Sequence, residues 1–252
     1  MKKTRYEIID SLRGLALVSM ILYHGCWDLV FLFEKNWNWY RGTGAYIWQQ
    51  SICWTFIFLS GFCWPMGRRP MRRGVIVFAG GAVVSLVTCL FMPESRVMFG
   101  ILTMTGSCML LMCLFDKVFV RIPALIGLVG GTVLFVLTRN INSGYLGFEG
   151  WNFLKLPNSL YQKGIMTFLG FPASGFFSTD YFSLFPWLFL FAAGYFLHRL
   201  LAGKNNGMLP GWCEIKGFLP LNFLGRHSLI LYMLHQPVIY GALMALSLFG
   251  LL

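Results

Sequence analysis

The sequence has few charged residues for its length. Only 12% of its 252 residues are Asp, Glu, Lys or Arg, and nine are acidic. A soluble domain carries about a quarter charged residues, so this composition excludes an ordinary water-soluble protein. The chain also lacks a Cys-x-x-Cys pair and any Cys/His cluster with zinc spacing, and we expect no metal site. It has no Gly-x-Ser-x-Gly elbow, phosphate-binding loop or dinucleotide fingerprint, which argues against the enzymes that these motifs mark.

What the sequence does contain is a series of long apolar runs, and 57% of its residues are hydrophobic. Runs of about 18 residues or more are long enough to cross a bilayer as helices. We expect spans at residues 8–33, 45–64, 74–92, 97–115, 122–138, 182–201 and 226–250. The predicted fold class is all-α: one polytopic helical bundle over residues 1–252, integral to the inner cell membrane, with about seven transmembrane helices and a cytoplasmic N-terminus.

The net charge of +11 comes mostly from the short connections between these runs. The connections on one side carry Lys2, Lys3, Arg5, Arg68, Arg69, Arg72, Arg73, Lys117, Arg121, Arg199, Lys204 and Lys216. Those on the other side carry Lys35, Arg41, Arg96, Arg139, Lys155 and Lys163. Because cytoplasmic loops are enriched in Lys and Arg, this asymmetry places the first set inside. Topology therefore accounts for the basic charge, and we expect the lipid bilayer, and no nucleic acid, as a partner.

One connection, residues 139–181 on the predicted outer face, is much longer than the others. Loops of this length are often functional lids. Its stretch from Tyr161 to Phe177 is apolar but broken by Gly and Pro, which suits an interfacial or re-entrant segment. At its end, Asp180 either caps the N-terminus of the sixth span or faces the outer mouth of a site.

The first span contains four ionisable residues: Asp10, Arg13, His24 and Asp28. Each costs about 2.5 to 3.5 kcal/mol at the bilayer centre, so such residues face a cavity or a partner by default. At 100° per residue, Arg13 and His24 differ by about 20°, and the two aspartates lie about 60° to either side. The four side chains thus form one polar stripe that extends about 27 Å along the helix.

The spacing within the stripe suggests two pairs. We expect Asp10 to pair with Arg13 near the cytoplasmic end, and Asp28 to hydrogen-bond His24 one turn away in the outer half. A carboxylate beside an imidazole orients the ring for general-base or nucleophilic catalysis. The alternative is structural, because polar residues also hold membrane helices together.

The last span carries a second polar face, formed by His227, Ser228, Tyr232, His235 and Gln236, which we expect to meet the first. Its alternative roles are an interfacial position for His227 and the satisfaction of a kinked backbone before Pro237. Elsewhere, Arg68, Arg69, Arg72 and Arg73 form the densest basic cluster. This cluster is either a topology signal or a site for anionic lipid headgroups or the phosphates of a nucleotide-like cofactor.

Several motifs of the chain occur in a fixed order. They are Ile9-Asp10-Ser11-Leu12-Arg13-Gly14-Leu15-Ala16, His24 with Asp28, Phe58-Leu59-Ser60-Gly61, Phe99-Gly100-Ile101-Leu102, Tyr181-Phe182-Ser183-Leu184-Phe185-Pro186-Trp187, Leu224-Gly225-Arg226-His227-Ser228 and His235-Gln236-Pro237. Together they resemble the bacterial relatives of the heparan-alpha-glucosaminide N-acetyltransferase catalytic domain. The Leu-Arg-Gly opening followed by His24 also resembles integral-membrane sugar O-acyltransferases.

The resemblance implies that an acetyl group from cytoplasmic acetyl-CoA is transferred to a sugar amine or hydroxyl of an envelope glycan or glycolipid on the far side. His24 would then act as general base or acyl acceptor, Asp28 would orient it, and Arg13 with Asp10 would shape the cytoplasmic channel. The basic cluster would hold the CoA phosphates.

The chain departs from that family at two positions. The family's lysosomal member has its proposed histidine where this chain has Glu34-Lys35-Asn36-Trp37, and many bacterial relatives have a histidine where this chain has Thr103. Either His24 carries the catalytic role or the activity differs. Two further hypotheses are a proton-coupled transporter or permease that uses the same stripe and a non-catalytic anchor of an envelope assembly. The acceptor, the acyl chain and the oligomeric state, including a homo-oligomer, stay open.

Overall fold

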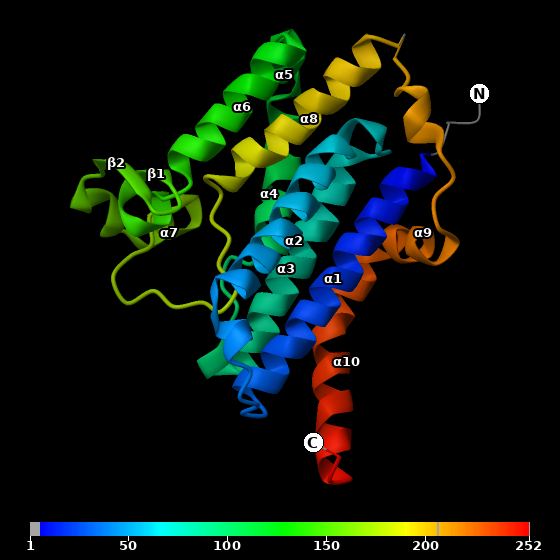
Figure 1. Cartoon of the computed structure of the whole chain (residues 1–252). Helices are drawn as coiled ribbons and strands as arrows, with labels where there is room; N and C mark the ends of the chain where they lie inside the picture. Colours follow the sequence, from blue (N-terminus) through cyan, green and yellow to red (C-terminus); the bar gives the residue numbers. More distant parts are fainter. Residues whose placement is uncertain (1–5, 206, 252) are drawn as a thin grey trace. The chain divides into compact units, whose positions relative to one another are not determined.

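The computed structural model describes residues 6–205 and 207–251 and is built mainly of α-helices (Figure 1). Lys2, Lys3 and Arg5, which the charge count placed inside, lie outside the described residues. Each predicted span coincides with a helix: α1 (Glu7–Phe31), α2 (Thr43–Phe62), α3 (Pro70–Phe91), α4 (Ile101–Leu114), α6 (Ala124–Thr138), α8 (Trp187–Gly203) and α10 (Ser228–Leu248).

Four stretches of the described chain are long and apolar enough to cross a membrane: α1, α3, Ala124–Ser143 and α10. The apolar helices α4 and α8 are shorter. Large apolar side chains stand exposed on α3, α6 and α10, among them Phe91, Ile126 and Val238 at 78%, 64% and 64%. Exposed apolar area of this extent is expected for helices that face lipid.

The chain divides into two compact units, Met1–Phe56 with Leu209–Leu252, and Ile57–Met208; α2 runs from the first into the second. In the first unit, α1 packs against the short helix α9 (Leu219–Arg226) and against α10, which runs alongside it (Figure 1). The approach of α1 to α9 depends on glycine. A Cβ on Gly14 would lie 2.1 Å from the Leu221 carbonyl oxygen, and one on Gly225 would lie 1.9 Å from the Asp10 carbonyl oxygen.

The helix α10 contains a proline, Pro237, in its interior. Proline has no backbone N–H, so the Met233 carbonyl cannot accept the usual i+4 hydrogen bond from this position. One core cluster of the first unit contains Leu17, Met20 and Ile52, and Tyr232, on the N-terminal side of this proline, packs against it.

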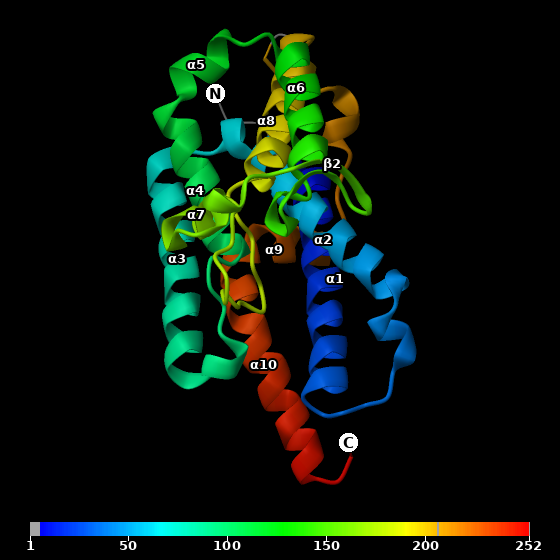
Figure 2. The same cartoon turned by 90° about the vertical axis from the view of Figure 1, so that its left-hand side faces the viewer.

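In the second unit, α3 pairs with α4, and α6 pairs with α8 (Figure 2). The helix α4 is followed directly by α5 (Asp116–Arg121). Arg199 on α8 donates hydrogen bonds to the carbonyl oxygens of Phe119, Val120 and Ile122 at the end of α5. The last carbonyls of a helix lack partners further along it, so this guanidinium satisfies acceptors at the C-terminal end of α5.

The long connection contains structure that we did not predict. An antiparallel hairpin of β1 (Tyr145–Phe148) and β2 (Trp151–Lys155) is followed by the short helix α7 (Gly164–Leu169). The expected all-α class is therefore correct for the predicted spans and wrong for this hairpin. Gly144, with φ of 90°, makes the left-handed turn that leads into β1.

Candidate functional site

The polar stripe of α1 meets partners on α9 and α10. Along α1 from its N-terminus, Asp10 contacts Arg226, Arg13 contacts Ser228, His24 contacts His235, and Asp28 contacts Gln236. The two polar faces, which are more than 200 residues apart in sequence, therefore lie against each other within one unit. This arrangement is the geometric basis of the candidate site.

At the N-terminal end, the contacts differ from those expected. We predicted a pair between Asp10 and Arg13. Instead, Arg13 Nη2 donates to Ser228 Oγ at 2.7 Å, and Arg226 Nε lies 3.4 Å from Asp10 Oδ2. The Arg226 side chain is 35% exposed, so its ion pair is screened by solvent and stabilises the fold little. Ser228 is buried, and its bond to Arg13 ties α1 to the start of α10.

The centre of the site is a pair of histidine rings. The His24 and His235 ring centroids are 4.8 Å apart with an interplanar angle of 62°. His235 Nδ1 is hydrogen-bonded to the Tyr232 carbonyl oxygen. A carbonyl only accepts, so Nδ1 carries the proton, and in a neutral ring Nε2 keeps its lone pair. This Nε2 atom is buried and has no hydrogen-bond partner among the described residues.

Asp28 lies beside the histidine pair and is fully buried. We predicted a hydrogen bond from Asp28 to His24, and this was wrong: Gln236 Nε2 donates to Asp28 Oδ1 at 2.6 Å. The cause is tertiary, because the amide that bonds Asp28 comes from α10 and not from α1 itself. Asp28 Oδ2 and Gln236 Oε1 have no partner within residues 6–205 and 207–251. Buried polar atoms without partners are rare and mark sites that take a water, a ligand or a proton.

The other two members of the predicted second face lie differently. Tyr232 packs into the core of the first unit and lies beside the His235 ring, with centroids 5.2 Å apart. His227 is exposed; its Nδ1 bonds the Phe223 carbonyl oxygen, and its ring packs on Phe223, both within the α9 end. His227 therefore lies away from the stripe and fits the interfacial role.

An aromatic cluster surrounds the C-terminal half of α1, and sequence reasoning missed it. Tyr40 donates to the Tyr23 carbonyl oxygen at 2.8 Å, and the Trp48 ring packs edge-on against Tyr23. Trp39 stacks on Trp37 and on Trp48, with centroids 6.1 and 6.4 Å away, and is 54% exposed. The density of aromatic residues in Trp37-Asn38-Trp39-Tyr40 was the signal for this cluster.

The basic cluster lies at the start of α3, in the second unit. Arg68, Arg69 and Arg72 are exposed and Arg73 is half-buried. The first turn of α3 has no acidic residue, and a helix N-terminus is itself electropositive. Guanidinium groups at this end repel one another and the helix dipole, so this position favours an anion.

Asp180 also belongs to the second unit, and of its two expected roles the structure corrects one, the cap of the sixth span. It accepts a hydrogen bond from the Ile101 backbone N–H and so caps α4, whereas α8 begins only at Trp187. Residues 178–182 run beside residues 96–99: Met98 N–H donates to Ser178 Oγ, and Phe182 N–H donates to the Phe99 carbonyl oxygen. Burial raises the pKa of Asp180 from 3.8 to about 6.

This raised pKa predicts a pH-dependent stability. The neutral carboxyl is favoured in the fold, so its contribution is complete below pH 3.8 and is lost as the pH rises through about 6. Asp180→Asn stays neutral and keeps an oxygen for the Ile101 N–H. Its thermal midpoint, measured in detergent, should exceed that of the unmodified protein at about pH 7.5 and match it at about pH 4. An equal difference at both pH values would contradict this assignment.

The described residues contain no group of three or more His, Cys, Asp or Glu that could hold a metal ion. They do contain a fourth histidine that we did not predict as a site residue. His198 is buried on α8 and lies edge-on to Phe62, 5.1 Å between centroids.

These features define a helical membrane protein. Its long helices are apolar, and its polar site contains a histidine pair. Residues 5–237 match the model of the heparan-alpha-glucosaminide N-acetyltransferase catalytic family, and the chain belongs to this family. The family indicates membrane acetyltransferase activity in general. The matched range begins before α1 and ends directly after Gln236, so it includes both faces of the site. No curated protein and no solved structure gave a significant match.

Proposed function

We propose that this protein transfers an acetyl group from acetyl-CoA to a sugar amine or hydroxyl of an envelope glycan or glycolipid. In this proposal the chain crosses the inner membrane seven times with its N-terminus in the cytoplasm, as the distribution of Lys and Arg favours. The observation that carries the proposal is the His24–His235 pair, in which a buried Nε2 atom is held ready for a proton.

The histidine pair supplies the base. An attacking amine or hydroxyl must lose a proton, and a positioned imidazole is the side chain that most often takes it. Tyr232 fixes the His235 tautomer through its carbonyl, so the proton goes to Nε2. His24, whose ring lies against His235, either shares this role or accepts the acetyl group itself. Asp28, held by Gln236 and one helical turn from His24 on α1, would stabilise positive charge on the pair.

The arginines of the basic cluster are the residues that would hold the donor. Acetyl-CoA supplies an activated thioester carbonyl and carries phosphates, which suit guanidinium groups with no acid in the adjoining helix turn. Arg68, Arg69 and Arg72 are exposed and reach solvent from the start of α3.

The test is transfer of radiolabelled acetyl groups from acetyl-CoA to envelope fractions by the purified protein in lipid nanodiscs. Labelled glycan or glycolipid supports the proposal. Flux of a solute or of protons across proteoliposome membranes, without turnover of acetyl-CoA, would contradict the proposal and indicate a transporter.

The exposed tryptophan stack predicts an effect on the acceptor. Aromatic faces stack on the C–H faces of sugars, and an aromatic contact contributes about 0.5 to 1.5 kcal/mol, or roughly a 2- to 13-fold change in affinity. Trp39→Ala should therefore raise KM for the sugar acceptor by about this factor and leave KM for acetyl-CoA unchanged. Trp212→Ala removes a similarly exposed indole, 58% against 54%, and serves as the control. Equal effects of the two substitutions would argue against a sugar platform at Trp39.

A further inference from the structure

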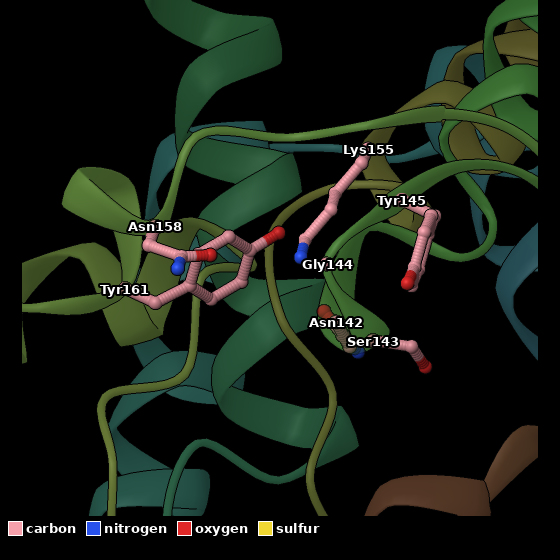
Figure 3. A pocket seen from close by; sticks show the side chains of 7 residues that line it. All are labelled: Asn142, Ser143, Gly144, Tyr145, Lys155, Asn158 and Tyr161. Carbon is pink, nitrogen blue, oxygen red and sulfur yellow. The ribbon is translucent and has the colours of Figure 1, made fainter.

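The connection between α6 and α8 contains an open pocket of about 320 Å³. Seven residues line it: Asn142, Ser143, Gly144, Tyr145, Lys155, Asn158 and Tyr161 (Figure 3). All of them come from the hairpin and the turns on either side of it, so a single segment of the second unit builds the whole pocket. Its size is at the lower end of the range for small-molecule sites, which suits one sugar ring.

The wall of this pocket is rich in hydrogen-bond donors. Lys155 projects its ammonium group into the space between Tyr161 and the turn at Asn142 (Figure 3). The other polar groups are two side-chain amides and three hydroxyls, and no Asp or Glu lines the pocket. The electrostatics therefore favour an anion.

Several of these side chains are held in place by the fold. The Tyr161 hydroxyl donates to the Ile141 carbonyl oxygen at 2.6 Å, and Ser183 Oγ bonds Asn142 Oδ1 at 2.9 Å. Burial raises the pKa of Tyr161, so its hydroxyl stays neutral and does not repel an anion. The Asn142 side chain is thus held by Ser183, whose Oγ also bonds the Phe185 carbonyl oxygen. A preformed set of polar groups of this kind loses little conformational entropy when a ligand binds.

The aromatic rings narrow the class of ligand. Tyr145 and Tyr161 each place a ring at the pocket (Figure 3), and ring faces suit the C–H surfaces of a pyranose. A simple inorganic anion would use the ammonium group and leave the rings and amides without a role.

We propose that this pocket binds a sugar ring that carries an acidic group, a carboxylate or a phosphate, with Lys155 on the acid and the amides and hydroxyls on the ring oxygens. The identification of that sugar as part of the acetyl acceptor rests on the proposed function. Binding itself does not, because the pocket is complete without the histidine pair.

Binding is tested by saturation-transfer NMR on the full protein in nanodiscs, without acetyl-CoA, using glucuronic acid as the probe. A charge-assisted hydrogen bond changes affinity by about 10-fold or more, so glucose should compete at least ten times more weakly than glucuronate. Inorganic phosphate, which has charge but no ring, should also compete weakly. Glucose and glucuronate of equal affinity, or phosphate as strong as glucuronate, would overturn the proposal.

Two substitutions complete the experiment. Lys155→Met should weaken glucuronate binding by about 10-fold or more, and Lys163→Met, which changes an exposed lysine of the same connection that does not line the pocket, should leave it unchanged. Asn158→Ala removes an exposed amide and should weaken binding without affecting the hairpin. Glucuronate affinity that is the same in Lys155→Met as in the unmodified protein overturns the assignment. Acetyl transfer without glucuronate binding would reject only the proposal for this pocket. Glucuronate binding without acetyl transfer would reject only the proposed function.

Discussion

Acetyl transfer by the His24→Ala protein is expected to fall by about 10²- to 10⁴-fold, the usual contribution of a positioned general base. The His24 ring lies 4.8 Å from His235 between centroids and beside the buried Asp28, so its removal takes away one half of the only histidine pair found in the described first unit. The measurement is the initial rate of labelled acetyl transfer at saturating acetyl-CoA. A rate within threefold of the unmodified protein would remove His24 from the chemistry.

A double substitution tests whether the two rings act together. His235→Ala should cause a similar loss, and the double variant should be little slower than either single variant, because residues that act as a unit are not additive. His227→Ala is the matched control, since His227 is exposed and its side chain contacts Phe223 at the end of α9. Multiplied losses in the double variant would show that the histidines act independently.

Gly225→Val should disrupt the first unit. A Cβ at Gly225 would lie 1.9 Å from the Asp10 carbonyl oxygen, and this atom cannot move unless α1 moves away from α9. Overpacking costs typically 1 to 3 kcal/mol, and a clash with backbone is expected to reach at least about the upper value. The thermal midpoint in detergent should therefore fall by several degrees, and the Arg13–Ser228 contact next to this point should be lost.

The control for this substitution is Gly241→Val. A Cβ at Gly241, on α10, would have no atom within 4 Å, so the added methyl groups have space. Its thermal midpoint should match that of the unmodified protein. Equal destabilisation by both substitutions would mean that the cost is intrinsic to valine in a helix and not to the contact between α1 and α9.

The helices could be predicted from sequence because their signal is local. A long apolar run needs no information about its partners, and each predicted range coincides with a helix of the structure. The β1–β2 hairpin could not be predicted in this way. Its strands are four and five residues long, and Trp151, Phe153 and Leu154 are all exposed, so the alternation of buried and exposed residues that marks a strand is missing.

The candidate site was predictable as two faces but not as a set of contacts. Helical geometry places Asp10, Arg13, His24 and Asp28 on one side of α1 whatever surrounds them. The partner of each side chain depends on how α10 is rotated about its axis and shifted along α1. The periodicity of the sequence does not determine either quantity. The prediction of a bond between Asp28 and His24 therefore failed, because Gln236 of α10 donates to Asp28 across the helix interface.

Pro237 directly follows the two residues of α10 that meet His24 and Asp28. Because this proline leaves the ladder of α10 one hydrogen bond short, bending at this point requires less energy than elsewhere in the helix. More than two turns before Pro237, the Arg13–Ser228 bond fixes the N-terminal end of α10 to α1. A bend of α10 at Pro237 would therefore change the distance between the two imidazoles and leave the Arg13–Ser228 contact in place.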